Sequence, residues 1–300
     1  MKNVPARQLL AAATPRRLAL PERGVEIALL DFGGAGPLAL AQHANGFCKG
    51  MWAEVAHVLR GELRVVAMDA RGHGDSSRPE GSQAFAWREF AVDLAAVAAR
   101  LVAEAGRPLA LGIGHSFGGT SLLGAAAARP ELFERLLLVD PVTPPPPAQQ
   151  GPERAAHVGQ MVDAARRRRN DWPSRAEARA WFGERSLFAG WTPVALDLYV
   201  EDGLRERPDG SVELKCPGAV EAAVFEQGEA LDVMTWTKGL PQPALWLWAE
   251  RGNFPLPFYE ALAGSMARAR IERVPGGHLI PMERPDRVAA AARRLLATAP

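Results

Sequence analysis

The stretch Pro108 to Ala128 reads PLALGIGHSFGGTSLLGAAAA, and it joins an apolar run to a helical pattern through a glycine-rich turn. Pro108 to Ile113 predicts a buried strand, and Phe117 to Ala128 predicts a helix. Residues 114–118 between them follow the pattern G-x-S-x-G. This pattern is weak by itself, but between a strand and a helix it predicts a sharp turn that exposes the Ser116 hydroxyl. The alternative is a glycine-rich turn with an incidental serine.

Apolar runs of strand length alternate with helical patterns on both sides of this stretch. Further strands are predicted at Val25 to Asp31, Pro37 to Gln42, Arg64 to Asp69, Leu136 to Asp140, Pro243 to Ala249 and Arg270 to Val274. Helices are predicted at Met51 to Arg60, Trp87 to Ala105 and Pro285 to Ala297. This alternation favours an α/β fold, with a mainly parallel sheet flanked by helices.

The sequence pattern changes at Pro144, where four consecutive prolines begin. Such a tract cannot join a central strand or a helix interior, so we expect an extended connector. Beyond it, to about Gly239, the pattern is helical, with helices predicted at Pro152 to Arg169 and Ser174 to Trp181. We therefore predict a helical lid at residues 144–240, inserted between two parts of an α/β core at 1–143 and 241–300.

Composition excludes some classes of partner. The 300 residues are 48% hydrophobic and carry a formal charge of only +1. Such a chain is long enough for one large domain or a domain with an inserted subdomain, and it lacks the charge signature of nucleic-acid or anionic-membrane binding. We therefore expect a small-molecule partner. The chain gives no indication of its oligomeric state.

The amino-terminal apolar stretch, Leu9 to Ala13, is too short for a signal-peptide core or a membrane span. We expect a cytoplasmic protein. Cys48 and Cys216 lie far apart and show no metal-ligand spacing, so free thiols are expected and no metal is predicted.

A serine hydroxyl needs a base to take its proton, and His278 is the best candidate. It follows the final predicted strand in the glycine loop VPGGHLIPMERP, which leaves room for the ring to reach inward. His115 is adjacent to Ser116, and adjacent residues of a turn point apart. The remaining histidines have ordinary interpretations in loops or helices.

Backbone N–H groups are the expected donors for an oxyanion. One should come from Phe117, directly after the serine. The stretch LALAQHANGFCKG supplies a second loop, in which Gly46 frees the backbone to direct the N–H of Phe47. His43 in this loop is interpreted as a bracing residue.

With these motifs in view, the chain resembles the α/β-hydrolase superfamily over nearly its whole length. The resemblance is carried by His43-x-Asn45-Gly46-Phe47, by DARGHGDSSRP from Asp69 to Pro79, by GHSFGG and by GGHLIPMERP. It implies an eight-stranded, mostly parallel sheet, a lid after the sixth strand and no cofactor.

The acid of the predicted triad departs from the usual pattern of that family. Most members carry it after the seventh strand, where this chain has Gly252 in place of the expected aspartate. Some relatives, such as haloalkane dehalogenases, hold it at the end of the sixth strand, and Asp140 lies there, 24 residues after Ser116. Asp140 is therefore the candidate acid, Glu250 is its rival, and a turn residue with no chemistry is the alternative.

The predicted lid is the least informative part of the sequence. Trp172, Trp181 and Trp191 are interpreted either as its core or as an aromatic wall of the substrate pocket. The run Arg166 to Arg169 fits a solvated helix face or cap salt bridges. Leu214 to Ala222 looks like a specific loop, for which the sequence suggests no chemistry.

Together these features predict a serine hydrolase that cleaves an ester or lactone of a small, fairly apolar substrate through an acyl-enzyme. Ser116 is the predicted nucleophile, His278 the base and Asp140 the group that orients it. A carbon–carbon bond hydrolase or cofactor-free lyase would use the same triad, and a ligand receptor with slow turnover would retain it.

Overall fold

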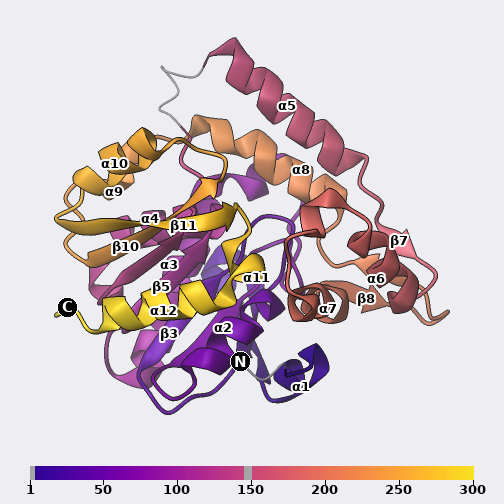
Figure 1. The fold of residues 1–300 in the computed structure, drawn as a ribbon, viewed down its shortest axis with the longest axis horizontal. Coiled ribbons are helices and arrows are strands. Elements are labelled where there is room, and N and C mark those ends of the chain that lie inside the picture. The colour runs from indigo at the N-terminus through magenta and orange to yellow at the C-terminus, as the bar shows by residue number, and fades with distance from the viewer. Residues whose placement is uncertain (1–3, 145–150) are drawn as a thin grey trace.

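Eight strands form one sheet in the computed structural model, which describes residues 4–144 and 151–300 (Figure 1). The strand order is β1-β2-β4-β3-β5-β6-β10-β11. β2 pairs antiparallel with β1 and β4, and the other pairings are parallel. The strands are β1 (Thr14–Leu20), β2 (Val25–Asp31), β3 (Leu38–Gln42), β4 (Arg64–Met68), β5 (Leu111–His115), β6 (Leu136–Val139), β10 (Pro243–Arg251) and β11 (Arg268–Gly277). The prediction of an eight-stranded, mostly parallel sheet is confirmed.

Strand β1 was not predicted from the sequence. Its residues, TPRRLAL, are mostly exposed and show no apolar alternation. Arg16 and Arg17 form ion pairs with Glu104 and Glu26. A proline and two arginines are typical of an edge strand, where they discourage pairing with another chain.

Helices cover both faces of the sheet. α3 (Trp87–Ala105), α4 (Phe117–Ala128) and α10 (Leu256–Gly264) pack on one face, and α2 (Ala53–Leu59) and α12 (Pro285–Leu296) pack on the other. In β6, Leu136 and Leu138 join the first cluster while Leu137 and Val139 join the second. Both faces of the central strands are therefore buried, which explains their unbroken apolar sequences.

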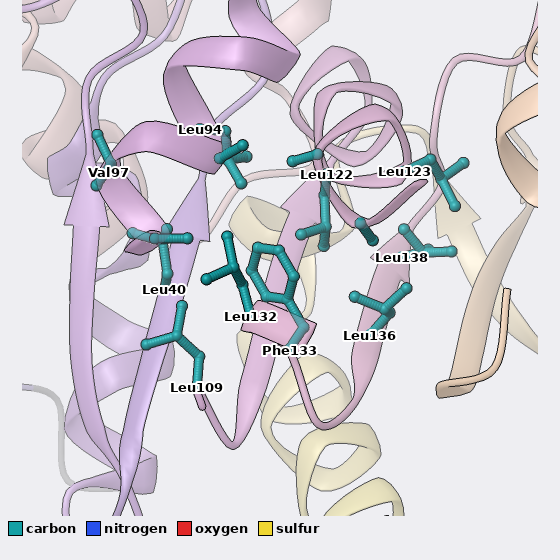
Figure 2. Packing of buried hydrophobic residues seen from close by; sticks show 14 of the residues in the cluster. Leu40, Leu94, Val97, Leu109, Leu122, Leu123, Leu132, Phe133, Leu136 and Leu138 are labelled. Atoms are coloured by element: carbon teal, nitrogen blue, oxygen red, sulfur yellow. The ribbon is translucent and has the colours of Figure 1, made fainter. Parts of the chain in front are cut away.

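The core under α3 and α4 contains mostly leucines, packed around Phe133 (Figure 2). β5 presents glycines to α4. A Cβ added at Gly112 would lie 2.7 Å from Leu122 Cδ1, and one at Gly114 would lie 2.5 Å from the Gly118 oxygen. The helix can therefore lie unusually close to the strand that precedes it.

The segment between β6 and β10, here called the insertion, is not entirely helical. Its helices are α5 (Pro152–Arg166), α6 (Arg175–Gly183), α7 (Pro193–Asp202), α8 (Gly218–Glu226) and α9 (Met234–Thr237). It also holds a three-stranded antiparallel sheet, β7-β9-β8, made of Asp171–Trp172, Val212–Leu214 and Leu204–Glu206. The prediction of a purely helical block is wrong in this part.

A turn signal for this small sheet is present in the sequence. Asp209-Gly210 lies between β8 and β9, and Gly210 has a φ of 83°. Its N–H donates to the Arg207 carbonyl (2.9 Å), and the Arg207 N–H donates to Ser211 O (2.8 Å). An Asp-Gly pair between two short strands favours a hairpin.

Figure 1 shows α5 and α8 running side by side, with α5 on the outside of the insertion. α1 (Ala6–Ala11) packs against α7, and α11 (Ile280–Glu283) follows β11. The extended connector predicted for the proline tract lies, beyond Pro144, outside the described residues. No helix in the described ranges is long and apolar enough to span a membrane.

Leu138→Ala should lower the free energy of unfolding by about 2–5 kcal/mol, because Leu138 is fully buried in the cluster of Figure 2 and a cavity would remain. The measurement is the urea midpoint at constant m-value. Val92→Ala on the exposed side of α3, where Val92 is 42% exposed, is the control and should change stability by less than about 0.5 kcal/mol. Equal effects of the two substitutions would contradict the assignment of the core.

Candidate active site

Ser116 lies at the turn between β5 and α4, and it has φ 55° and ψ −125°. Positive φ is uncommon for a residue other than glycine and marks a strained backbone. The Ser116 N–H donates to Val139 O (2.9 Å), while its carbonyl accepts from Gly119 N (2.9 Å) and Thr120 N (3.2 Å). The turn is thus held by the neighbouring strand and by the first turn of α4.

The glycines around Ser116 are required by close backbone approach. A Cβ at Gly118 would lie 2.5 Å from the carbonyl oxygens of both Gln42 and His43. A Cβ at Gly119 would lie 2.8 Å from Pro141 Cβ. The turn therefore touches the chain immediately after β3 and immediately after β6.

Three predicted site residues lie in hydrogen-bond contact. His278 Nε2 is 2.8 Å from Ser116 Oγ, and His278 Nδ1 is 2.6 Å from Asp140 Oδ2. The three residues follow β5, β6 and β11, whose carboxyl ends lie at one edge of the sheet. Clefts for ligands form at this edge of an α/β sheet.

The carboxylate of Asp140 is buried and fully engaged. Besides His278, it accepts hydrogen bonds at Oδ1 from Ala249 N (2.9 Å) and from the Tyr259 hydroxyl (3.2 Å). Burial, followed by the nearby charge of Asp140, holds the pKa of Tyr259 well above its ordinary value, so the phenol stays a donor. Tyr259 was missed in the sequence, where it is one aromatic residue of α10 among several.

Position 252, where the resemblance places the usual triad acid, has no room for a side chain. A Cβ at Gly252 would lie 2.6 Å from Asp140 Oδ2, so a side chain there would occupy the space of this carboxylate. The rival Glu250 is exposed at the end of β10. Of the three positions, the structure brings only Asp140 to the histidine.

His278 is held by its own loop. Gly276 has a φ of 151°, and the Gly277 N–H donates to Oε2 of Glu283, the last residue of α11 (2.9 Å). His115 Nε2 lies 2.9 Å from the His278 carbonyl oxygen. His115 thus contacts the backbone of His278 rather than the Ser116 hydroxyl, as its place in the turn suggested.

The structure corrects the predicted oxyanion donor Phe47. The Phe47 N–H donates to the Ala44 carbonyl (3.2 Å), and its ring packs against Trp191 and Tyr199 in the insertion. The prediction placed the donor too far along the loop, because the chain closest to the turn at Ser116 is the end of β3.

Asn45, two residues before Phe47, lies closer to Ser116 in the structure. It lines the same cavity as Ser116 and Phe117. In the described part of the chain, the N–H groups of Asn45 and Phe117 have no hydrogen-bond acceptor. Gly118 lies close to the carbonyl oxygens of Gln42 and His43, which brings the loop that contains Asn45 to the turn at Ser116.

A cavity of about 280 Å³ opens above Ser116. Its lining is mostly apolar, with a few polar groups at Asn45, Arg154, His157 and Asn253. The apolar part consists of Trp87, Phe117, Val142, Val158, Met161, Phe225 and Phe254. α5 and α8 of the insertion therefore form one side of the cavity, as expected for a segment that covers the serine.

The three tryptophans predicted as a possible pocket wall do not line this cavity. Trp172 and Trp191 are buried in a cluster that also contains Phe47 and Phe182, and Trp181 packs at its margin. Their ring contacts lie within the insertion and with the loop after β3. Their packing fits the alternative that the sequence offered, a core for the insertion.

Cys48 and Cys216 are free and buried, as expected. Burial raises the pKa of both thiols, which makes them poor nucleophiles. No group of three or more potential metal ligands occurs in the ranges that the structure describes.

A mostly parallel, eight-stranded sheet covered on both faces, with a serine at the turn after β5, defines the α/β-hydrolase class of fold. A family model described as "Alpha/beta hydrolase family" matches residues 39–291. The chain belongs to this family.

Curated relatives match parts of the chain. The "Type I acyl-CoA thioesterase mpaH" of Penicillium roqueforti is 31% identical over 175 residues, 56% of this chain and 36% of that protein. The "Lipase LipV" of Mycobacterium tuberculosis is 31% identical over 187 residues, 62% of this chain and 65% of that protein. The chain spans less than two thirds of the length of either relative.

Solved structures agree with the fold at low identity. E-2-(acetamidomethylene)succinate hydrolase superposes with a TM-score of 0.79 at 18% identity, covering 95% of this chain and 100% of that one. The enol-lactonase of Burkholderia xenovorans has a TM-score of 0.69 at 21% identity, covering 94% and 100%. At such identities the likeness concerns the fold alone.

Buried histidines around the site should make the protein sensitive to acid. Burial lowers the pKa of His73 to about 4, that of His115 to about 3 and that of His43 well below its ordinary value. Below about pH 6.5 these histidines bind protons in the unfolded chain, whereas in the folded protein the buried rings stay neutral. The free energy of unfolding therefore falls as the pH falls from 6.5 toward 4. Burial raises the pKa of Asp69 to about 6. The folded protein therefore binds a proton at Asp69 that the unfolded chain does not bind, which opposes the loss of stability.

The net loss should be about 2–3 kcal/mol of unfolding free energy between pH 6 and 5, measured by urea denaturation. His115→Gln should reduce this slope, and His157→Gln, at an exposed position of α5, should leave it unchanged. A stability that is constant from pH 6.5 to 4.5 would contradict the neutral state of these rings.

Proposed function

We propose that the protein is a serine hydrolase that cleaves a carboxylic ester or lactone through an acyl-enzyme. The observation that carries this proposal is the continuous contact from Ser116 Oγ through His278 to Asp140, with distances of 2.8 and 2.6 Å. An isolated serine hydroxyl is a weak nucleophile, and a base in hydrogen-bond contact is what activates it.

In the proposed reaction, His278 Nε2 takes the proton of Ser116 Oγ as the oxygen attacks the substrate carbonyl. Asp140 keeps the proton on Nδ1 and stabilises the imidazolium that forms. His278 then gives its proton to the leaving alcohol oxygen. A water molecule, deprotonated by the same nitrogen, attacks the acyl-enzyme, releases the acid and restores Ser116.

The N–H groups of Asn45 and Phe117 are the proposed oxyanion donors. Both residues line the cavity above Ser116, and neither N–H has another acceptor in the described chain. Phe117 is also the first residue of α4, and the positive end of a helix dipole favours the negative oxygen of the tetrahedral intermediate. This replaces the predicted role of Phe47.

The shape of the cavity supports a small, fairly apolar substrate. A volume of about 280 Å³ lined by Trp87, Phe225 and Phe254 suits a short acyl group or a single ring. A thioester is the second candidate, because one of the curated relatives named above is an acyl-CoA thioesterase and the same triad cleaves both bonds. Carbon–carbon bond cleavage and slow-turnover binding remain the alternatives that turnover measurements separate.

The insertion is proposed to act as a lid. Arg154, Val158 and Met161 of α5 face the cavity, while most of α5 is exposed and only Val162 and Ala165 are buried. Covering the serine would exclude bulk water from the acyl-enzyme until the hydrolytic step.

The test of the function is a fluorophosphonate probe together with p-nitrophenyl butyrate and a butyryl thioester. The probe should label Ser116, and Ser116→Ala should abolish both labelling and turnover. His278→Ala should lower kcat by roughly 10³-fold or more, and Asp140→Asn by roughly 10²-fold or more, with little change in folding. Turnover of the two substrates decides between ester and thioester.

Glu250→Gln is the matched control for Asp140→Asn, because Glu250 is exposed near the same strand ends. It should keep nearly all of the activity. Labelling of another serine, or full activity of Asp140→Asn, would overturn the assignment. A wild-type protein that is labelled at Ser116 but turns over neither substrate would favour the alternatives.

A further inference from the structure

Two sequence features without an assigned role meet beside the candidate oxyanion hole. They are the arginine run Arg166 to Arg169 and the loop Leu214 to Ala222, both in the insertion. Within the run, Arg167 is 74% exposed, whereas the side chain of Arg168 is only 16% exposed. Arg168 therefore points inward and forms a salt bridge with Glu221, which fits the second interpretation of the run, salt bridges at a helix end, rather than a solvated helix face.

The guanidinium of Arg168 connects the insertion to the loop after β3. Its Nη1 donates to Glu221 Oε2 (2.6 Å), and its Nη2 donates to the Tyr199 hydroxyl. The Tyr199 hydroxyl in turn donates to the carbonyl oxygen of Gly46 (3.2 Å). The peptide between Gly46 and Phe47 is thus held from the insertion.

Asn45 itself is fixed from two sides. Its Nδ2 donates to the Glu221 carbonyl oxygen (3.0 Å), and its Oδ1 lies 3.0 Å from His73 Nε2. Neighbouring Gly46 has a φ of 80°, and a Cβ on it would lie 2.9 Å from the Glu221 carboxylate. The loop therefore passes so close to the Glu221 carboxylate that position 46 has room only for glycine.

Arg168 stays charged and Tyr199 stays protonated in this cluster. Burial alone would lower the pKa of the Arg168 guanidinium, but Tyr199 and Glu221 raise it above its ordinary value. Burial raises the pKa of Tyr199, so its hydroxyl keeps the proton that it donates to Gly46. A buried ion pair of this kind contributes little net stability and is better suited to fixing a geometry.

The other end of the same loop is also held by the insertion. Asp202, at the end of α7, accepts from Gly50 N (2.8 Å) and from Lys49 Nζ (3.3 Å). The loop from Asn45 to Gly50 is therefore anchored at both ends by residues that follow β6 in sequence.

We propose that Arg168 and Glu221 are positioning residues that set the Asn45 N–H as an oxyanion donor, so that the oxyanion hole is complete only when the insertion is packed on the core. The inference rests on the proposed function. Neither side chain lines the cavity, so both act through Asn45. Loss of a whole oxyanion donor costs about 10²- to 10³-fold in kcat, and a displaced donor should cost less.

The experiment compares Arg168→Met, Glu221→Gln and Tyr199→Phe with Arg167→Met as the matched control. With p-nitrophenyl butyrate, Arg168→Met and Glu221→Gln should lower kcat about 10- to 100-fold and change KM less than about twofold, since the ground state makes little use of the donor. Inhibition by an alkyl trifluoromethyl ketone, which forms a tetrahedral oxyanion on Ser116, should weaken by the same factor as kcat. Arg167→Met should match the wild type in all three quantities.

Tyr199→Phe keeps the packed ring and removes only the bridge to Gly46, so it decides the question if Arg168→Met fails to fold. It should lower kcat about 3- to 10-fold, and its effect should not add to that of Arg168→Met in a double variant. Folded variants with wild-type kcat and wild-type ketone affinity would overturn the proposal, as would a loss confined to KM. If Ser116→Ala retained activity, the proposed function itself would fail, and that outcome is separate.

Discussion

The strained backbone of Ser116 is the constraint on which the rest of the structure depends. A φ of 55° between β5 and α4 turns the chain sharply enough to present the hydroxyl, and the packing around this turn leaves no room for side chains at Gly114, Gly118 and Gly119. Gly114 and Gly118 let α4 start against the ends of β5 and β3. Asn45 and Phe117, the first residue of α4, both line the cavity above the serine.

The parts of the site that could be predicted are those with a local signature. Ser116 sits in a turn pattern between a strand and a helix, His278 follows the last strand in a glycine loop, and Asp140 ends an apolar strand. Their mutual distances follow from parallel strand order, because the carboxyl ends of β5, β6 and β11 share one edge. The absence of an aspartate at position 252 can also be seen in the sequence. The structure explains it, because a side chain there would clash with the carboxylate of Asp140.

The parts that sequence reasoning missed depend on contacts between distant segments. Asn45, rather than Phe47, faces the cavity because Gly118 packs against the end of β3, and no pattern within the loop indicates this. The tryptophans of the insertion looked available for a ligand, but they fill its core together with Phe47. Arg168 lies in a run that resembles a solvated helix face, and only the fold brings it to Glu221 and Tyr199.

In the proposed site, Ser116 attacks the carbonyl carbon of the substrate and His278 takes the serine proton. The N–H groups of Asn45 and Phe117 bind the carbonyl oxygen of the same group. A crystal structure of the covalent adduct formed by an alkyl phosphonate on Ser116 tests this directly. A phosphoryl oxygen should lie within about 2.7–3.1 Å of both the Asn45 and Phe117 nitrogens, with the alkyl group in the cavity beside Trp87. A phosphoryl oxygen bound to the Phe47 nitrogen, or to neither Asn45 nor Phe117, would contradict it.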